Sequence, residues 1–157
     1  MSNKAISLVL GSGGARGLAH VGVIRWLEEH GHKIRSISGC SIGSFIGGAY
    51  VTGTLDAIVD WMENLTKKEI YSMLDLSFSR DSLVKGEKLA EAIQSKIGTG
   101  LIEDLPIKFT AVAADIATEK EHWFQTGPID QAIRASVSLP LLFTPHTVDG
   151  VQLIDGG

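Results

Sequence analysis

The sequence is poor in cysteine, proline and aromatic residues, and it lacks runs of basic residues. A single cysteine among 157 residues excludes an internal disulfide and fits a reducing compartment. The net charge is −4 and no basic run exceeds Lys67-Lys68, which argues against nucleic-acid binding and against electrostatic adsorption to anionic lipid. No secretory signal is visible, because the first residues lead directly into an apolar segment. We therefore expect a cytoplasmic protein.

The sequence also lacks a convincing membrane span. Positions 36–55 carry no charge, but nine of them are glycine or serine, which favours a strand, a turn and a helix over a span. Apolar residues make up 44% of the chain, which is enough for one domain with a real core. The 18 glycines gather mainly around positions 11–17 and 39–53, which indicates backbone packed tightly around a site.

Apolar periodicity predicts strands that alternate with helices. The expected strands cover 4–10, 34–38, 107–114, 121–125 and 153–154. The expected helices cover 18–30, 44–50, 55–65, 67–74, 86–97 and 128–137, and 77–85 is an ambiguous, loop-like segment. The first strand is apolar enough for burial on both faces. The strand at 121–125 is expected to pair antiparallel with 107–114, and Asp149-Gly150 predicts a hairpin turn. The pattern predicts an α/β fold with a mainly parallel sheet.

The segment around Ser41 carries a pattern of nucleophilic chemistry. Gly39-Cys40-Ser41-Ile42-Gly43 joins an expected strand to an expected helix, as in the G-x-S-x-G nucleophile elbow. Glycine is needed on both sides because the strained serine backbone passes close to neighbouring chain. The following helix directs its free N–H groups at whatever binds beside Ser41. A glycine-rich turn with an incidental serine is the alternative interpretation.

A second glycine-rich segment, Gly11 to Gly17, follows the first expected strand. A dinucleotide fingerprint starting at Gly11 would need glycine where Arg16 stands, and a Walker A loop would need a Gly-Lys-Ser/Thr ending, so nucleotide binding is disfavoured. Unshielded N–H groups at a helix N-terminus can form an oxyanion hole. Parallel neighbouring strands would bring this loop and Ser41 to one edge of the sheet. A tight strand-to-helix turn is the alternative.

A serine nucleophile needs a base, and the residues leave more than one candidate. His146, in a proline-bounded loop, is the histidine that fits a triad best. Asp115 and Asp155 each follow an expected strand and could act directly on Ser41 if partly buried beside it. Asp155-Gly156 is also a turn dipeptide, so the residues alone do not decide. No histidine pair has the spacing of a metal site.

Three motifs together resemble the patatin-like phospholipase family. They are Gly13-Gly14-Ala15-Arg16-Gly17, Gly39-Cys40-Ser41-Ile42-Gly43 and Asp155-Gly156-Gly157, supported by Ala135-Ser136-Val137-Ser138-Leu139-Pro140. The resemblance implies a three-layer α/β/α fold, with Ser41 as nucleophile and Asp155 as base. It also implies an oxyanion hole formed by Gly13, Gly14, Ala15 and Arg16, with Gly11, Gly17, Gly39, Gly43, Gly156 and Gly157 as motif glycines. Ser12 departs from the family pattern, since many members carry glycine there.

The resemblance further implies hydrolysis of acyl esters of lipids and phospholipids, without metal or other cofactor. The expected partner is a lipid or fatty-acyl ester, met through transient contact at a membrane surface. Acyl transfer from the same acyl-enzyme and a non-catalytic lipid-binding or regulatory module are the alternatives. Family domains usually continue beyond the Asp-Gly motif, so residues 1–157 are expected to be the N-terminal part of a longer catalytic domain, truncated at its C-terminus. The sequence does not indicate an oligomeric state.

Overall fold

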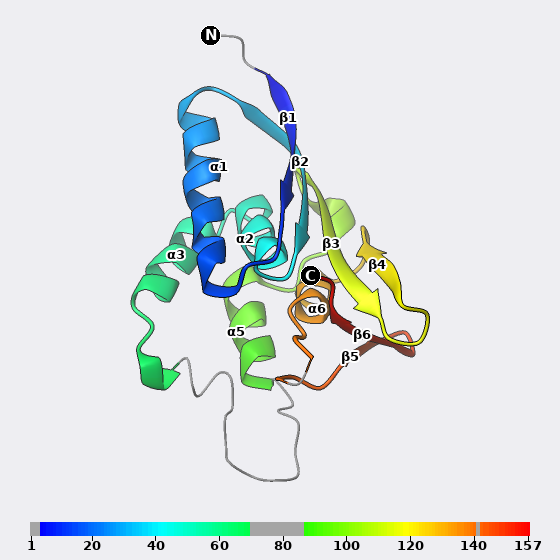
Figure 1. Ribbon diagram of the computed structural model, residues 1–157. Coiled ribbons are helices and arrows are strands. Elements are labelled where there is room, and N and C mark those ends of the chain that lie inside the picture. The colour runs from blue at the N-terminus through cyan, green and yellow to red at the C-terminus, as the bar shows by residue number, and fades with distance from the viewer. Residues whose placement is uncertain (1–3, 70–86, 141) are drawn as a thin grey trace.

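A computed structural model describes residues 4–69, 87–140 and 142–157 (Figure 1). The strands are β1 (Ala5–Leu10), β2 (Lys33–Cys40), β3 (Lys108–Asp115), β4 (Lys120–Phe124), β5 (His146–Val148) and β6 (Val151–Asp155). The helices are α1 (Ala19–Glu29), α2 (Ile42–Val51), α3 (Leu55–Glu63), α5 (Glu87–Ile97) and α6 (Ile129–Ser136), with 3-10 turns η1 (Gly14–Leu18) and η2 (Ile102–Asp104). Residues 70–74 of the expected helix at 67–74 lie outside the described residues, as does the whole segment at 77–85.

The order of elements follows the apolar pattern, and the predicted α/β class is confirmed. Strand β4 is the antiparallel partner of β3, as predicted. The hairpin between β5 and β6 turns at Asp149 and Gly150, whose φ angles of 49° and 82° fit the two-residue turn that matches strand twist. Helix α6 begins directly after Pro128, a residue whose fixed φ favours a helix start.

Strand β3 is central, because three other strands pair with it. Residues 108–112 pair with parallel β2, residues 111–115 with antiparallel β4, and residues 113–115 with antiparallel β6. A strand has only two edges, so β2 and β6 must share the edge opposite β4, one after the other. Strands β1, β2, β3 and β5 run in one direction and β4 and β6 in the other. The sheet is thus mainly parallel in strand direction.

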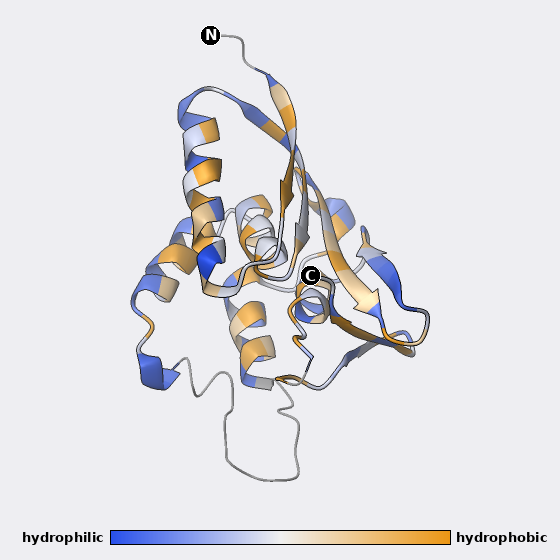
Figure 2. Cartoon of the chain, in the orientation of Figure 1, coloured by the Kyte–Doolittle hydropathy of each residue, from blue (hydrophilic) through white to orange (hydrophobic). Residues whose placement is uncertain are grey.

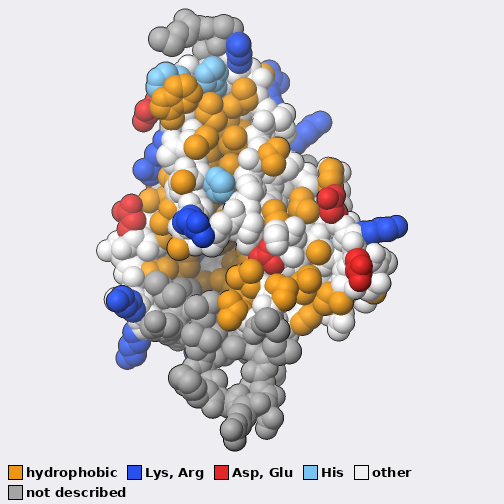
Figure 3. Space-filling view, in the orientation of Figure 1, with side chains coloured by type: hydrophobic (Ala, Val, Ile, Leu, Met, Phe, Trp, Pro, Cys, Tyr) orange, Lys and Arg blue, Asp and Glu red, His pale blue; other side chains and the backbone are white. Residues whose placement is uncertain are grey.

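The helices share one hydrophobic core with the inner face of the sheet (Figure 2). The strands contribute Leu10, Ile37 and Phe109, and α2 and α6 contribute Ile46 and Ile133. The opposite face of the sheet is not covered to the same extent within the described residues, where Val9 is 79% exposed and Trp123 is 59% exposed. Apolar side chains therefore gather over α1 and β1 on the face shown in Figure 3.

Strand β1 lies at the edge of the sheet and pairs only with β2 among the described strands. Its even-numbered side chains, Ile6, Leu8 and Leu10, pack against the core, whereas Val9 faces outward. The expectation that this strand is buried on both faces is wrong within the described residues. An edge strand under a single helical layer buries only alternate side chains.

Helix α2 crosses the ends of β1 and β2 with almost no space between the backbones. A Cβ built at Gly43 would overlap the carbonyl of Leu10 and would lie 2.7 Å from Gly11 O. A Cβ at Gly47 would lie 2.7 Å from Ile37 Cγ2. Glycine thus allows the helix to start directly against the sheet, which places its N-terminus at the strand ends.

Replacement of Gly43 by alanine is expected to destabilise the fold by more than about 3 kcal/mol, because the clash is with fixed backbone rather than with a movable side chain. Urea unfolding of the purified variant measures the loss. The control is Gly22→Ala, in the interior of α1, where an added Cβ meets nothing within 4 Å. That change should stabilise the protein by about 0.5–1 kcal/mol. Equal behaviour of the two variants would contradict the close approach of α2.

Candidate active site

Ser41 lies at a sharp turn between strand and helix. Strand β2 ends at Cys40 and α2 begins at Ile42, so Ser41 is the single residue that joins them. Its φ of 55° and ψ of −128° are costly for a residue with a side chain. A Cβ at Gly39 would lie 2.5 Å from Gly43 O, so the turn closes only with glycine at position 39. The serine side chain is held at the helix N-terminus, as in a nucleophile elbow.

Asp155 reaches Ser41 because β6 follows β2 along the same edge of β3. Strand β2 ends with Cys40 opposite Val112, and β6 ends with Asp155 opposite Ala113. The two strand ends therefore meet head to head. Ser41 Oγ donates a hydrogen bond to Asp155 Oδ2 at 2.5 Å. Both residues are buried, with 5% and 6% of their surfaces exposed.

The Asp155 carboxylate is oriented by its second oxygen as well. Gly157 N donates to Asp155 Oδ1 at 2.8 Å. The main-chain amide of Asp155 donates to Ser138 O at 2.8 Å, which ties β6 to the turn after α6. Charge-assisted hydrogen bonds from an amide and a hydroxyl hold the carboxylate in one orientation. The carboxylate of Asp155 therefore cannot rotate freely beside Ser41.

The other candidate bases lie elsewhere. Asp115 caps a turn, since its carboxylate accepts from Ala117 N at 2.8 Å and from Thr118 Oγ1 at 2.7 Å, and these bonds lower its pKa. His146 begins β5, and its Nε2 lies 2.8 Å from Oε1 of Gln131 in α6. Burial lowers the pKa of His146, and the charge of Arg134 lowers it further. The structure thus brings one of the candidate bases, Asp155, to the serine.

The glycine-rich loop at positions 11–17 contacts the segments that follow Ser41 and Asp155. A Cβ at Gly17 would overlap Ile42, and a Cβ at Gly157 would overlap Ser12. The loop is therefore packed on the start of α2 and on the segment that follows Asp155. Gly17 permits close packing of the loop on Ile42, at the start of α2.

Not all the expected amide donors of the loop are available. The Arg16 amide donates to Gly13 O at 3.2 Å within η1, so it is already used. The first amides of a helical turn have no acceptor within the turn. The candidate oxyanion donors therefore reduce to Gly13, Gly14 and Ala15. The glycine pattern did not predict this 3-10 turn, and the oxyanion role of the loop amides stays a prediction.

Cys40 lies next to the aspartate but is poorly suited to be a nucleophile. Its Sγ lies 4.0 Å from Asp155 Oδ1. Burial raises the pKa of the Cys40 thiol, and the negative charge of Asp155 raises it further. The thiol therefore stays protonated near neutral pH. Among the described residues, no group of three or more His, Cys, Asp or Glu side chains is placed to hold a metal ion.

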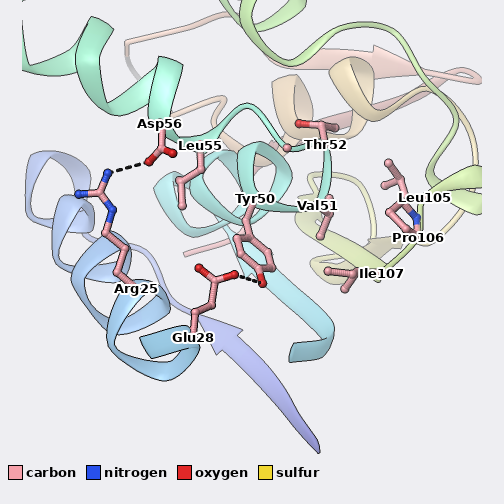
Figure 4. Close-up of a pocket in the computed structure, with 11 residues that line it drawn as sticks. Arg25, Glu28, Tyr50, Val51, Thr52, Leu55, Asp56, Leu105, Pro106 and Ile107 are labelled. Atoms are coloured by element: carbon pink, nitrogen blue, oxygen red, sulfur yellow. Dashed lines mark hydrogen bonds and ion pairs between the residues drawn. The ribbon is translucent and has the colours of Figure 1, made fainter. Parts of the chain in front are cut away.

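A cleft of about 690 Å³ lies at the other end of α2, away from Ser41 (Figure 4). Its polar side chains are engaged with one another: Arg25 Nη2 pairs with Asp56 Oδ1 at 2.8 Å, and Tyr50 donates to Glu28 Oε1 at 2.8 Å. Burial and the carboxylate of Glu28 raise the pKa of Tyr50 to about 12. These contacts tie α1 to α2 and α3, so we assign the cleft a structural role.

Two buried serines beside the site had no role assigned from the sequence. Ser136 ends α6 and Ser138 follows it, and both contact the residues that meet at the strand ends. The available signal was their place in a segment that matched the family resemblance. Their contacts depend on how α6 docks against β3, which no local pattern reveals.

The elbow, the buried aspartate and the glycine loop at one end of the strands define an α/β protein of the nucleophile-elbow class. Residues 8–157 match the family model of patatin-like phospholipase, and the chain belongs to this family. The crystal structure of VipD from Legionella pneumophila has a similar fold, with a TM-score of 0.58 at 18% identity over 96% of this chain and 45% of that one. The expected patatin-like fold is confirmed.

Several curated relatives carry NTE in their names. An uncharacterized NTE family protein of Mycobacterium tuberculosis is 46% identical over 156 residues, which cover 99% of this chain and 43% of that protein. Lysophospholipase NTE1 of Candida albicans is 37% identical over 161 residues, which cover all of this chain and 12% of that protein. The chain thus spans less than half the length of these relatives. None of the helices within residues 4–69, 87–140 and 142–157 is long and apolar enough to cross a bilayer.

The position of Cys40 provides a test of the site that does not depend on activity. Alkylation of Cys40 by iodoacetamide should need a higher pH than alkylation of the same cysteine in denatured protein, because burial and Asp155 raise its pKa. Asp155→Asn removes the negative charge and should shift the alkylation profile to lower pH. Mass spectrometry across a pH series measures both. Asp115→Asn is the control, and an equal shift in that variant would contradict the contact between Cys40 and Asp155.

Proposed function

We propose that the protein is a serine esterase that hydrolyses acyl esters of lipids through a dyad of Ser41 and Asp155. The hydrogen bond of 2.5 Å between Ser41 Oγ and Asp155 Oδ2, at a strained elbow, is the observation that carries the proposal. Membership of the patatin-like phospholipase family supports a lipid substrate. The names of the fungal relatives favour lysophospholipids as the first substrates to assay.

The first half of the reaction acylates Ser41. Asp155 takes the hydroxyl proton as Ser41 Oγ attacks the ester carbonyl, and the negative charge develops on the carbonyl oxygen. Amides of Gly13, Gly14 and Ala15 stabilise this oxyanion, together with the positive end of α2. The tetrahedral intermediate collapses as the alcohol leaves, and Asp155 returns the proton to that alcohol. The acyl group remains as an ester on Ser41.

The second half releases the acid. Asp155 takes a proton from a water molecule, which attacks the acyl-serine ester at the same carbonyl carbon. The second tetrahedral intermediate collapses with release of the carboxylic acid, and the proton held by Asp155 returns to Ser41 Oγ. The same carboxylate and the same amide donors thus serve both halves.

A carboxylate is a weaker base than an imidazole, so the proposed mechanism depends on proximity. The proton moves along a hydrogen bond that already exists, between two buried atoms 2.5 Å apart. A pre-formed geometry of this kind removes much of the entropic cost of bringing a base to its nucleophile. The two bonds that orient Asp155, from Gly157 N and to Ser138 O, support the same geometry.

Ser41→Ala and Asp155→Asn should each lower the turnover of a short-chain nitrophenyl ester and of a lysophospholipid by about 1000-fold or more in the full-length protein. Asp115→Asn is the matched control, because it removes a carboxylate that caps a turn and has no hydrogen bond to Ser41. Normal turnover in either dyad variant, or an equal loss in the control, would overturn the dyad.

The alternatives to hydrolysis give different results in companion assays. A fluorophosphonate probe should label Ser41 in the folded, full-length protein, and absence of an adduct would favour a non-catalytic lipid-binding module. Free fatty acid should be the main product with lysophospholipid and water. Accumulation of a diacyl product with a second lysophospholipid as acceptor would favour acyl transfer instead.

A further inference from the structure

We propose that Ser136 is a positioning residue that holds the Ser41 backbone in its reactive conformation; this inference rests on the proposed function. Ser136 is completely buried at the end of α6. Its hydroxyl accepts a hydrogen bond from Ser41 N at 2.9 Å and donates one to Val112 O at 2.6 Å. One side chain thus connects the elbow, the central strand and α6.

The hydroxyl occupies the point at which β2 leaves the sheet. The last pair between β2 and β3 joins Cys40 to Val112, and the next position on β3, Ala113, already pairs with Asp155. The amide of Ser41 therefore has no place in the ladder. Ser136 Oγ accepts from this amide and donates to the carbonyl of Val112, so both buried backbone groups are satisfied at the junction.

The bond to Ser41 N acts on the residue with the strained backbone. Ser41 has a φ of 55°, which a residue with a side chain adopts only when its surroundings hold it there. Ser44 Oγ donates to Ser41 O at 2.7 Å, so hydroxyls hold the residue on both sides of its Cα. The direction of the Ser41 side chain toward Asp155 follows from these two restraints. Ser136 is the one of the two that also reaches β3.

The same turn supports the other half of the dyad. Ser138 O accepts the amide of Asp155, and the Ser138 hydroxyl is held by Arg134, donating to its carbonyl and accepting from Nη1, both at 2.7 Å. Residues 136–138 therefore contact Ser41 and Asp155 through two separate bonds. A shift of α6 would move both partners, whereas loss of the Ser136 hydroxyl alone would release only the serine. This difference makes Ser136 a specific target.

A hydroxyl suits this position because it both donates and accepts. Alanine would leave an amide and a carbonyl unsatisfied in a site without solvent access. Cysteine is close in size and is a weak donor and acceptor, so it should restore part of the function. We expect the substitution to misdirect the Ser41 hydroxyl and to leave substrate binding unchanged.

The test compares Ser136→Ala with Thr110→Val in the full-length protein. Thr110 is another buried hydroxyl, on β3, whose bond to Gln125 Nε2 lies away from the dyad. Turnover of a nitrophenyl ester is normalised to folded protein, measured by circular dichroism, so that unfolded protein does not contribute. Ser136→Ala should lower kcat about 100-fold, because a small displacement of a reacting group has an effect of this size.

The KM of Ser136→Ala should stay within about twofold of the parent, because Ser136 is buried behind Ser41 and the change removes no contact with the substrate. Ser136→Cys should recover part of kcat, and Thr110→Val should keep the parent kcat per folded molecule. A normal kcat per folded molecule in Ser136→Ala, or an equal loss in Thr110→Val, would overturn the positioning role while leaving the dyad intact. Activity in Ser41→Ala would instead overturn the proposed function.

Discussion

The succession of β2 and β6 along one edge of β3 is the constraint on which the site depends. A parallel strand ends opposite Val112 and an antiparallel strand ends opposite Ala113, so two residues 114 positions apart in sequence meet end to end. The register of β6 is fixed by alternation, because Leu153 and Asp155 are buried on the same side of the strand. A slip by one residue would turn Ile154 toward the serine and Asp155 away from it. Core packing of a leucine thus determines where the carboxylate points.

Hydrogen bonds to the backbone of Ser41 offset the strain of its conformation. A residue in this backbone region costs about 1–3 kcal/mol. The hydroxyls of Ser136 and Ser44 bond the amide and the carbonyl of Ser41, and a typical bond contributes about 0.5–1.5 kcal/mol. The magnitudes are comparable, so the elbow is held without a large net gain or loss. Its conformation is set by the surrounding chain rather than by its own preference.

Local features of the fold and site could be predicted from the sequence, because they depend on neighbouring residues. Periodicity located the helices α1, α2, α3, α5 and α6 and every described strand except β5, and glycines 39 and 43 marked the elbow around Ser41. The choice among Asp155, Asp115 and His146 could not be made from the residues alone, because it depends on how β6 pairs with β3. The family resemblance, rather than spacing, supplied that choice.

Two further features of the chain were not visible in its composition. Strand β1 has an apolar composition on both sides, yet its position at the sheet edge leaves Val9 exposed among the described residues. The amide of Arg16 was an expected donor to an oxyanion, but the 3-10 turn directs it to Gly13 O. The first outcome depends on which segments cover the strand, and the second depends on the local backbone path of the glycine-rich turn.

The three glycine-containing motifs pack against one another, and this packing explains why glycine stands at several of their positions and why serine fits at position 12. Gly43 lies against the end of β1, Gly157 lies against Ser12, and a Cβ at Gly156 would lie 2.9 Å from Val112 O. Each glycine thus permits a close approach of two segments that are distant in sequence. Serine is accommodated at position 12 because the residue facing it has no side chain. The geometry at Ser41 therefore rests on backbones in direct contact, which leaves little room for the nucleophile and its base to drift apart.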